Sequence, residues 1–322
     1  MNQGERKISP PNDNTLTLDR DILTGFEQGL QPHRPETSDP PAVILGYGEI
    51  SSIFQIGDED GIAYKRMPLF RDVASAETYI GQYREYCGLL RKAGLTLPED
   101  GTELVDIPGR PVVLYIGQKL LPPERFGHKL IHTLDPAKAR LLIEKAASAI
   151  SRIWEFNKNS KPTLELAIDG QISNWVWLDN DPGSPLVYVD TSTPLFRKEG
   201  EIQLDPELFL QSAPSFLRWI IRRLFLEDVM TRYFDARQVY TDLVANLYKE
   251  QRPDLIPGAL ESINRFHLKD EAPLTAKEVE KYYKEDKTIW KVFLGFRRFD
   301  RWLKIRVQRR RYEFILPGKI KR

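Results

Sequence analysis

Residues 168–194, IDGQISNWVWLDNDPGSPLVYVDTSTP, place three oxygen-bearing side chains around a predicted hairpin. Asn174 follows Asp169 by five residues, and Asp190 comes directly after the second apolar run. The runs WVWL and LVYV are rich in β-forming residues, and DNDPGSP between them is typical of a turn. If the runs pair antiparallel, Asn174 and Asp190 start from the same end of the hairpin, and Asp169 lies a short loop away.

This arrangement suits metal-assisted chemistry on a hydroxyl group. Asn174 and Asp190 offer the oxygen ligands that a hard divalent cation such as Mg²⁺ prefers. Asp169 beside them could orient a hydroxyl nucleophile and accept its proton. The plainer interpretation is that Asp and Asn occupy turns and strand ends in many proteins, and the D-x-x-x-x-N pattern alone favours that interpretation.

A second set of candidate residues lies upstream. GYGEISSIF places Gly46 and Gly48 between two predicted strands, where glycine lets backbone amides approach a phosphate closely. In IAYK, Ala63 and Lys65 point to the same face of a strand, so that Ala63 leaves room for a flat base and Lys65 can reach phosphates. Glu85, on the next predicted helix, could pair with Lys65 and aim it. The ordinary interpretations are a hairpin turn, a solvated lysine and a surface glutamate.

The elements that must position these residues form an α+β pattern. Residues 42–67 predict three strands, AVIL, ISSIFQI and IAYKRM, and ELVDI and PVVLYI predict two more. Residues 72–93 predict a helix, because tyrosine and leucine recur at helical spacing before Gly94. From Asp135 onward the chain is mostly helical, over 135–157, about 206–250 and the C-terminal end.

The order of these motifs resembles the protein-kinase-like superfamily, and it looks closest to the aminoglycoside-phosphotransferase-like small-molecule kinases. The resemblance covers residues 42–250, approximately, and follows the order glycine turn, IAYK, helix, linker, long helix, DGQISN, hairpin and Asp190. It implies a two-lobed kinase-like fold, with a small β-rich N-lobe at 41–120 and a larger, mainly helical C-lobe at 121–270.

The resemblance also implies roles for the candidate residues. Asp169 would be the catalytic carboxylate that orients the acceptor hydroxyl, and Asn174 and Asp190 would hold Mg²⁺ on the phosphates of ATP. Lys65 would contact the inner phosphates and pair with Glu85.

Further residues would bind the nucleotide itself. Gly46 and Gly48 would cover the phosphates, and Ala63 would lie against the base. The linker Gln118–Leu120 would hydrogen-bond the adenine through its backbone near Lys119.

The sequence departs from the family pattern at three places. Ala167 and Ile168 precede Asp169 where the family commonly has His, DTS replaces Asp-Phe-Gly after the hairpin, and the third glycine of the nucleotide loop is missing. Two functions therefore stay open. One is ATP- and Mg²⁺-dependent phosphotransfer to a hydroxyl of a small molecule or of a protein, with GTP and nucleotidyl transfer as further alternatives. The other is a pseudokinase, a nucleotide-sensing or structural interaction module.

Composition narrows the classes of partner. The 322 residues carry a net charge of +1, so bulk charge predicts no nucleic-acid partner. The single cysteine, Cys87, excludes an internal disulfide and fits a reducing compartment. The first forty residues contain no apolar run of signal-peptide length, and no apolar stretch could span a bilayer. We expect a cytoplasmic protein.

The two ends of the chain have distinct compositions. Residues 1–40 are polar and Pro-rich and predict a mostly flexible arm. Residues 271–322 predict a basic amphipathic extension, since residues 291–311 hold nine basic side chains and one acidic side chain. The helix could lie on an anionic membrane or bind nucleic acid, or it could pack on the protein with its basic side in water. The apolar residues of its predicted face are Val292, Phe296, Phe299 and Leu303.

Overall fold

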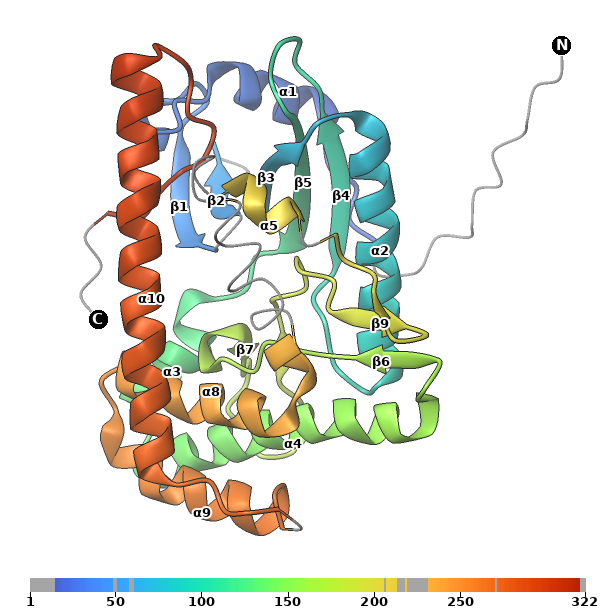
Figure 1. Ribbon diagram of the computed structural model, residues 1–322, viewed down its shortest axis with the longest axis vertical. Helices are drawn as coiled ribbons and strands as arrows, with labels where there is room; N and C mark the ends of the chain where they lie inside the picture. The colour runs from blue at the N-terminus through green and yellow to red at the C-terminus, as the bar shows by residue number, and fades with distance from the viewer. Residues whose placement is uncertain are drawn as a thin grey trace, which may run out of the picture.

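The computed structural model describes residues 15–48, 51–57, 61–205, 207–212, 218, 231–269 and 271–318. It combines a β-sheet with a mostly helical part that follows it in the chain (Figure 1). We call the part up to residue 119 the sheet region, and residues 120–302 the helical region.

The sheet region holds five strands in the order β1-β2-β3-β5-β4, and every neighbouring pair is antiparallel. Side chains alternate along β3, so Tyr64 and Met67 belong to two different core clusters on opposite faces of the sheet. All five predicted strands are confirmed: β1 (Ala42–Tyr47), β2 (Ser52–Ile56), β3 (Ile62–Phe70), β4 (Asp100–Val105) and β5 (Val112–Lys119).

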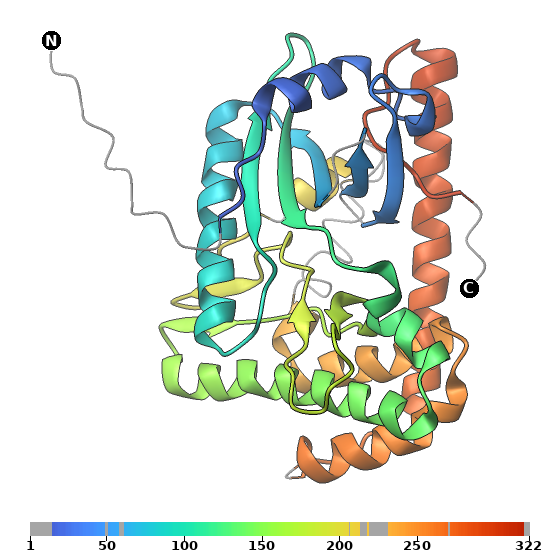
Figure 2. The same ribbon diagram turned by 180° about the vertical axis from the view of Figure 1, so that it is seen from behind.

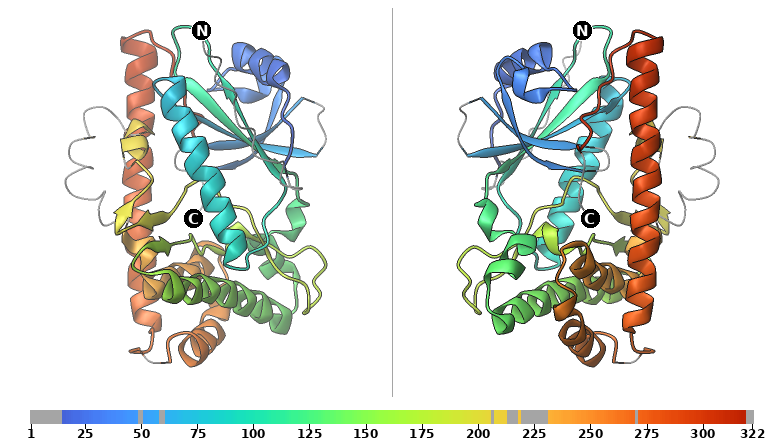
Figure 3. Two further views of the ribbon diagram at one scale, coloured as in Figure 1. Left: turned by 90° about the vertical axis from the view of Figure 1, so that its right-hand side faces the viewer. Right: turned by 90° about the vertical axis from the view of Figure 1, so that its left-hand side faces the viewer.

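Helices lie on both faces of this sheet (Figure 3). The predicted helix α2 (Val73–Lys92) begins after its N-cap Asp72. It ends before Gly94, whose φ of +85° suits glycine. The opposite face is covered by α1 (Arg20–Gly29), which Figure 2 shows crossing the strands.

A mostly flexible arm was predicted for residues 1–40. Residues 1–14 lie outside the described residues, and from residue 15 onward the prediction is wrong. The carboxylate of Asp19 caps the start of α1, and Leu23 and Phe26 of this helix are both 0 % exposed. The ring of Phe26 packs against Phe54 of β2, with 5.2 Å between the ring centroids. A few apolar side chains in an otherwise polar segment therefore help to hold α1 on the sheet, because they cover an apolar sheet face that would otherwise be exposed to water.

The structure gives the bounds of six helices in the helical region. The predicted helix at 135–157 is confirmed by α4. The stretch predicted to be mostly helical over about 206–250 includes α5 (Glu207–Ser212) and α8 (Ala236–Lys249), and the short η4 (Arg232–Phe234) precedes α8. The helices are α3 (Gly127–Thr133), α4 (Pro136–Ser160), α5 (Glu207–Ser212), α8 (Ala236–Lys249), α9 (Ile256–Phe266) and α10 (Ala276–Trp302).

One hydrophobic core connects the two regions. It runs from Met67 on the α2 side of the sheet, through Tyr86 of α2, to Ile150 of α4 and Leu243 of α8. A smaller cluster lies on the other face of the sheet, under α1. Short strands complete the helical region: β6 (Leu164–Leu166), β7 (Trp175–Val176), β8 (Val187–Tyr188), β9 (Phe196–Lys198) and β10 (Glu201–Ile202).

The long helix α10 runs alongside both regions (Figure 1). It packs against α8 in the helical region, and the chain after it returns to the sheet, where Ile315 joins the core cluster under α1. Among the described residues, no helix combines the length and the apolar character needed to cross a membrane.

Candidate active site

The predicted hairpin is confirmed. β7 pairs antiparallel with β8, and Trp175 lies opposite Tyr188. The backbone N–H of Val189 donates to the carbonyl of Asn174 at 3.0 Å. Asn174 and Asp190 therefore stand at the same end of the hairpin, as the antiparallel pairing requires.

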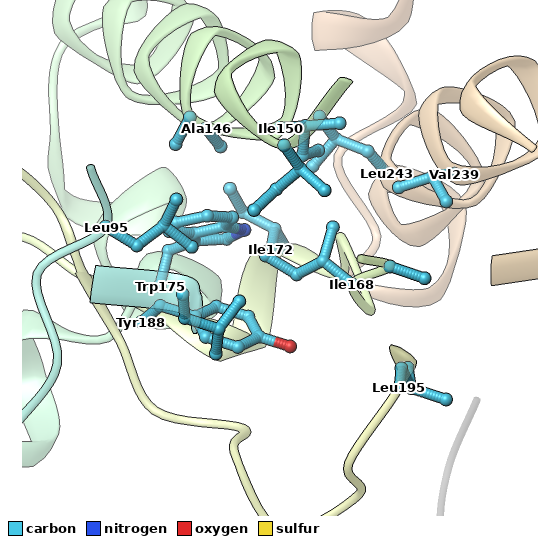
Figure 4. Packing of buried hydrophobic residues seen from close by; sticks show 14 of the residues in the cluster. Leu95, Ala146, Ile150, Ile168, Ile172, Trp175, Tyr188, Leu195, Val239 and Leu243 are labelled. Atoms are coloured by element: carbon cyan, nitrogen blue, oxygen red, sulfur yellow. The ribbon is translucent and has the colours of Figure 1, made fainter. Parts of the chain in front are cut away.

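A rigid apolar base supports this end of the hairpin. Figure 4 shows Ile168 and Ile172 packed with Trp175 below α4 and α8. The Trp175 indole donates to the carbonyl of Gly170 at 3.2 Å. A Cβ at Gly170 would lie 2.8 Å from the side chains of Ile150 and Val239, so a larger residue after Asp169 would force this packing to shift.

The carboxylate of Asp169 is half-buried and fixed by its own loop. The backbone N–H of Gln171 donates to Asp169 Oδ1 at 3.0 Å. The side-chain amide of Asn174 donates from Nδ2 to the backbone carbonyl of Asp169 at 3.3 Å. This bond orients the amide of Asn174 and leaves its oxygen as the remaining acceptor.

Lys65 connects the sheet to the hairpin. Its Nζ donates to the backbone carbonyl of Val189 at 2.9 Å and lies 3.3 Å from Asp190 Oδ1. The Lys65 side chain is only 6 % exposed. The hydroxyl of Ser192 also donates to Asp190 Oδ1, at 3.2 Å. The structure thus brings together Lys65 and Asp190, which lie 125 residues apart in the sequence.

The electrostatics of the site are dominated by carboxylates. Burial raises the pKa of Asp169 well above its ordinary value, and the nearby charges of Asp242 and Asp190 raise it further, while Arg232 opposes them. Burial also raises the pKa of Asp242, against the lowering effect of Arg232. A cation bound beside these carboxylates would relieve their repulsion.

Asp242 is a functional candidate that the sequence alone does not reveal. It lies in the middle of α8, within the ordinary helical stretch YTDLVANL. No spacing or turn signal distinguishes it there, because its position beside Asp169 results from helix packing alone.

Tyrosines of α2 hold the two loops that carry the candidate residues. The hydroxyl of Tyr86 donates to the carbonyl of Ala167 at 2.9 Å, two residues before Asp169. The hydroxyl of Tyr79 donates to the carbonyl of Ser192, two residues after Asp190. In the sequence, both tyrosines belong to the helical pattern of tyrosine and leucine over residues 72–93. Their hydroxyl groups could have indicated this role, because a buried tyrosine hydroxyl requires a hydrogen-bond partner.

A protein family model matches residues 30–301, and its description is "Family of unknown function (DUF6206)". The chain belongs to this family. The curated proteins include no match to it. Among solved structures, the chain is similar to one titled "WaaP in complex with acyl carrier protein". The sequence identity is 15 %, the match covers 67 % of this chain and 90 % of that one, and the TM-score is 0.32.

Glu85 does not reach Lys65, so the predicted ion pair between them is wrong. Its carboxylate pairs instead with Lys198 of β9, at 2.8 Å, on the surface. Glu85 precedes Tyr86 by one residue, which turns its side chain by about 100° around the helix and away from the site.

The glycine turn is described only in part. The N–H of Gly48 donates to the carbonyl of Ser51 at 3.0 Å, and a Cβ on Gly48 would lie 2.7 Å from the Ser51 hydroxyl. A Cβ on Gly46 would meet only ordinary contacts, the nearest at 3.6 Å. Residues 49–50 at the tip lie outside the described residues, so the phosphate-binding role of both glycines stays a prediction.

Ala63 and Gln118 lie side by side in the sheet. They are directly paired between β3 and β5. Gln118 is buried, and its amide donates to the hydroxyl of Thr191 at 3.0 Å. Its side chain therefore braces the residue that follows Asp190.

The predicted contact of adenine with the linker backbone is not open to the N–H groups of Lys119 and Leu120. The N–H of Lys119 donates to the carbonyl of Glu99 at 2.9 Å, and the N–H of Leu120 donates to the carbonyl of Gly61 at 2.7 Å. Both donors are used inside the fold because the linker continues β5, an inner strand with β3 on one side and β4 on the other.

The predicted metal ligands fit a cation that is shared with phosphates. No group of three or more His, Cys, Asp or Glu side chains in the described ranges is arranged to hold a metal ion. Mg²⁺ commonly binds through one or two carboxylates together with substrate phosphates. The carboxylate of Asp190 and the amide oxygen of Asn174 suit that mode of binding.

Proposed function

We propose that this chain is a phosphotransferase of kinase-like fold in the cytoplasm, which transfers the γ-phosphoryl group of ATP to a hydroxyl of a small molecule. The observation that carries the proposal is the approach of Lys65 to Asp190, 3.3 Å apart, at the hairpin end that also holds Asn174. The order of the elements supports it, since a lysine-bearing strand and a helix precede the Asp169 loop and its hairpin.

Each residue has a distinct task in this reaction. The acceptor oxygen forms a bond to the γ-phosphorus, the bond from that phosphorus to its bridging oxygen breaks, and the hydroxyl proton passes to the carboxylate of Asp169. Lys65 binds the phosphates and compensates their charge. Asp190 and Asn174 would hold Mg²⁺, which supplies further positive charge at the phosphates.

The alternative is a pseudokinase that binds a nucleotide without transferring phosphate. Two observations favour it. Glu85 pairs with Lys198 and so leaves Lys65 without the support that the family resemblance implies. The N–H groups of Lys119 and Leu120 are engaged within the fold.

Nucleotide binding and turnover separate these proposals. Thermal shift with ATP and Mg²⁺ measures binding, because a ligand at about 100 times its dissociation constant stabilises the native state by about 2.7 kcal/mol. Turnover is measured with labelled ATP, Mg²⁺ and a cell metabolite extract. Binding with product supports the transferase, and binding without product supports the pseudokinase. Neither binding nor product would reject both.

Variants of the hairpin test the metal ligands. Asp190→Ala should weaken Mg²⁺-dependent nucleotide binding and stop turnover together. Asn174→Ala should do so less completely, because a neutral amide supplies less charge to the cation. Asp179→Ala is the matched control, since this carboxylate is exposed at the far end of the same hairpin. If Asp190→Ala binds Mg-ATP as tightly as the wild type, the metal-site proposal is wrong.

A further inference from the structure

The C-terminal end of α10 exposes large apolar side chains. Phe299 is 50 % exposed, Trp302 53 %, Ile305 40 % and Val307 59 %. The rings of Phe299 and Trp302 are stacked, with 5.9 Å between their centroids. We call this segment, residues 299–310, the α10-end patch. It lies at the end of α10 that is beside the sheet region (Figure 1).

Several basic residues near the patch have partners inside the protein. Arg298 donates to the carbonyls of Pro317 and Gly318, and Arg297 is buried over the ring of Phe314. Lys304 pairs with Asp300 at 2.9 Å. Arg297 and Arg298 fix the returning chain against α10, and all three side chains account for part of the basic composition.

Three other arginines are exposed. Arg306, Arg309 and Arg310 have no ion-pair partner among the described residues, and all three lie within the patch. The charge is also unevenly distributed, because residues 291–311 carry a net charge of +8 while the whole chain carries only +1. The patch is therefore positive although the protein is nearly neutral.

The patch has a defined backbone. The helix ends in a π-helical turn, η6 (Leu303–Val307), and the N–H of Arg310 donates to the carbonyl of Lys304 at 2.8 Å. Three residues later, Glu313 pairs with Arg110 at 2.9 Å and thereby joins the chain to the sheet region. The exposed side chains are thus presented by a turn that is held on both sides.

We propose that the α10-end patch binds the surface of an anionic lipid membrane. Exposed aromatic and aliphatic side chains can enter the headgroup layer, and the arginines can pair with anionic headgroups. The positive charge of the patch is complementary to an anionic membrane surface and favours this partner. A second copy of the chain would bring the same arginines together, and nucleic acid would leave the apolar side chains without a role. These residues are separate from the proposed active site, so either proposal can fail alone.

The direct test is co-sedimentation of the full chain with vesicles. We expect binding to phosphatidylcholine vesicles that contain phosphatidylserine, weak binding to phosphatidylcholine alone, and weakening as salt is added. Arg306→Gln/Arg309→Gln/Arg310→Gln should lower the partition coefficient by about 100-fold, since each basic residue near the surface contributes about fivefold. Trp302→Ser/Ile305→Ser should lower it on the same vesicles.

The matched control removes the same charge from the other end of the same helix. Lys277→Gln/Lys281→Gln/Lys284→Gln lies in the first turns of α10 and should bind vesicles as the wild type does. A position-specific readout is Val307→Cys labelled with a polarity-sensitive dye, because the native Cys87 is buried. Its emission should shift to the blue on anionic vesicles, and a label at Lys281→Cys should not shift.

Several outcomes would overturn the proposal. Equal binding of both vesicle types, or equal loss in the control and patch variants, would show that the patch does not recognise anionic lipid. Self-association that Trp302→Ser/Ile305→Ser abolishes, without vesicle binding by the wild type, would assign the patch to a second copy instead. Retention of a DNA duplex without vesicle binding would assign it to nucleic acid.

Discussion

Two neighbouring side chains of β3, Lys65 and Arg66, point to opposite faces of the sheet and enter two different charge clusters. On the α1 face of the sheet, the Arg66 guanidinium lies 2.6 Å from a carboxylate oxygen of Glu27 and 3.2 Å from one of Glu313. We call the charged residues on this face the rear cluster. Arg110 also binds both glutamates, and Arg311 pairs with Glu313 at 3.2 Å, so three cations face two anions. On the α2 face of the sheet, Lys65 forms an ion pair with Asp190, and the charge of Asp190 acts on Asp169. We call Lys65, Asp169 and Asp190 the front cluster.

The two clusters have opposite effects on their carboxyl groups. Burial alone would raise the pKa of Glu27, but Arg66, Tyr115 and Arg110 outweigh it and hold the pKa below its ordinary value. For Asp169, burial raises the pKa, and Asp242 and Asp190 raise it further. The rear cluster is complete without a ligand. The front cluster has an excess of negative charge, which is typical of a site that binds a cation or holds a reactive group.

The largest expected effect comes from opening the rear cluster. Glu27→Gln leaves the buried Arg66 without its main counter-charge and should lower the free energy of unfolding by about 3–5 kcal/mol. Urea unfolding measures it. Glu103→Gln is the control, because its partner Arg20 is exposed and their pair is 3.9 Å long, and it should change stability by less than about 0.5 kcal/mol. Equal effects of the two variants would mean that the rear cluster is not a principal stabilising element.

The same cluster should also appear in the pH dependence of stability. The pKa values of Glu27 and Glu313 are lowered in the folded state, so their stabilising contribution is present above the unfolded pKa of about 4.5 and is lost as the pH falls through the folded values. The Glu27→Gln variant should therefore lose less stability on acidification than the wild type does. Melting temperatures measured from neutral to acidic pH would test this.

The front cluster should respond in the opposite direction. The raised pKa of Asp169 means that its ionised form is disfavoured in the folded state, so stability is lost as the pH rises through that pKa. Asp169→Asn should therefore raise stability at neutral pH by about 1 kcal/mol, while turnover falls by about 100-fold or more. The gain should diminish at acidic pH. A variant that loses both stability and turnover would show that Asp169 is structural.

Asp242 provides a finer test of the front cluster, resting on the proposed function. Asp242→Asn removes a negative charge that raises the pKa of Asp169, so the acid limb of the turnover profile should move to lower pH. Arg232→Gln removes the opposing positive charge and should move the limb to higher pH. A profile unchanged in both variants would show that Asp169 does not control the acid limb.

The parts of the site that could be predicted from the sequence are those that local rules determine. Turn chemistry and β-forming runs fix the hairpin, so Asn174 and Asp190 were correctly placed at one end of it. Alternation along a strand fixes the face on which Lys65 lies. The five strands and α2 follow from periodicity and from their terminal signals, and these were also predicted correctly.

The parts that could not be predicted depend on how distant segments pack. Glu85 was assigned to Lys65, but one residue of helical rotation gives it to Lys198. Asp242 reaches the site only through the docking of α8. The segment that becomes α1 has a polar composition, and its burial depends on an open sheet face that no local pattern in the segment reveals.

The smallest expected effects concern the tyrosines of α2, which position the front cluster without joining it. Tyr86→Phe removes the hydrogen bond to Ala167 and keeps the ring, so it should lower stability by about 1 kcal/mol. The Asp169 loop would then be held less firmly, and we expect turnover to fall by about tenfold with nucleotide affinity changed less than about twofold. Tyr240→Phe is the matched control, because its hydroxyl bonds to Ser151 at 2.7 Å in the helical region, away from both loops. It should cost similar stability and keep full turnover. If both variants lose turnover in proportion to stability, the tyrosines act through general rigidity, and the front cluster is positioned by its own loop contacts alone.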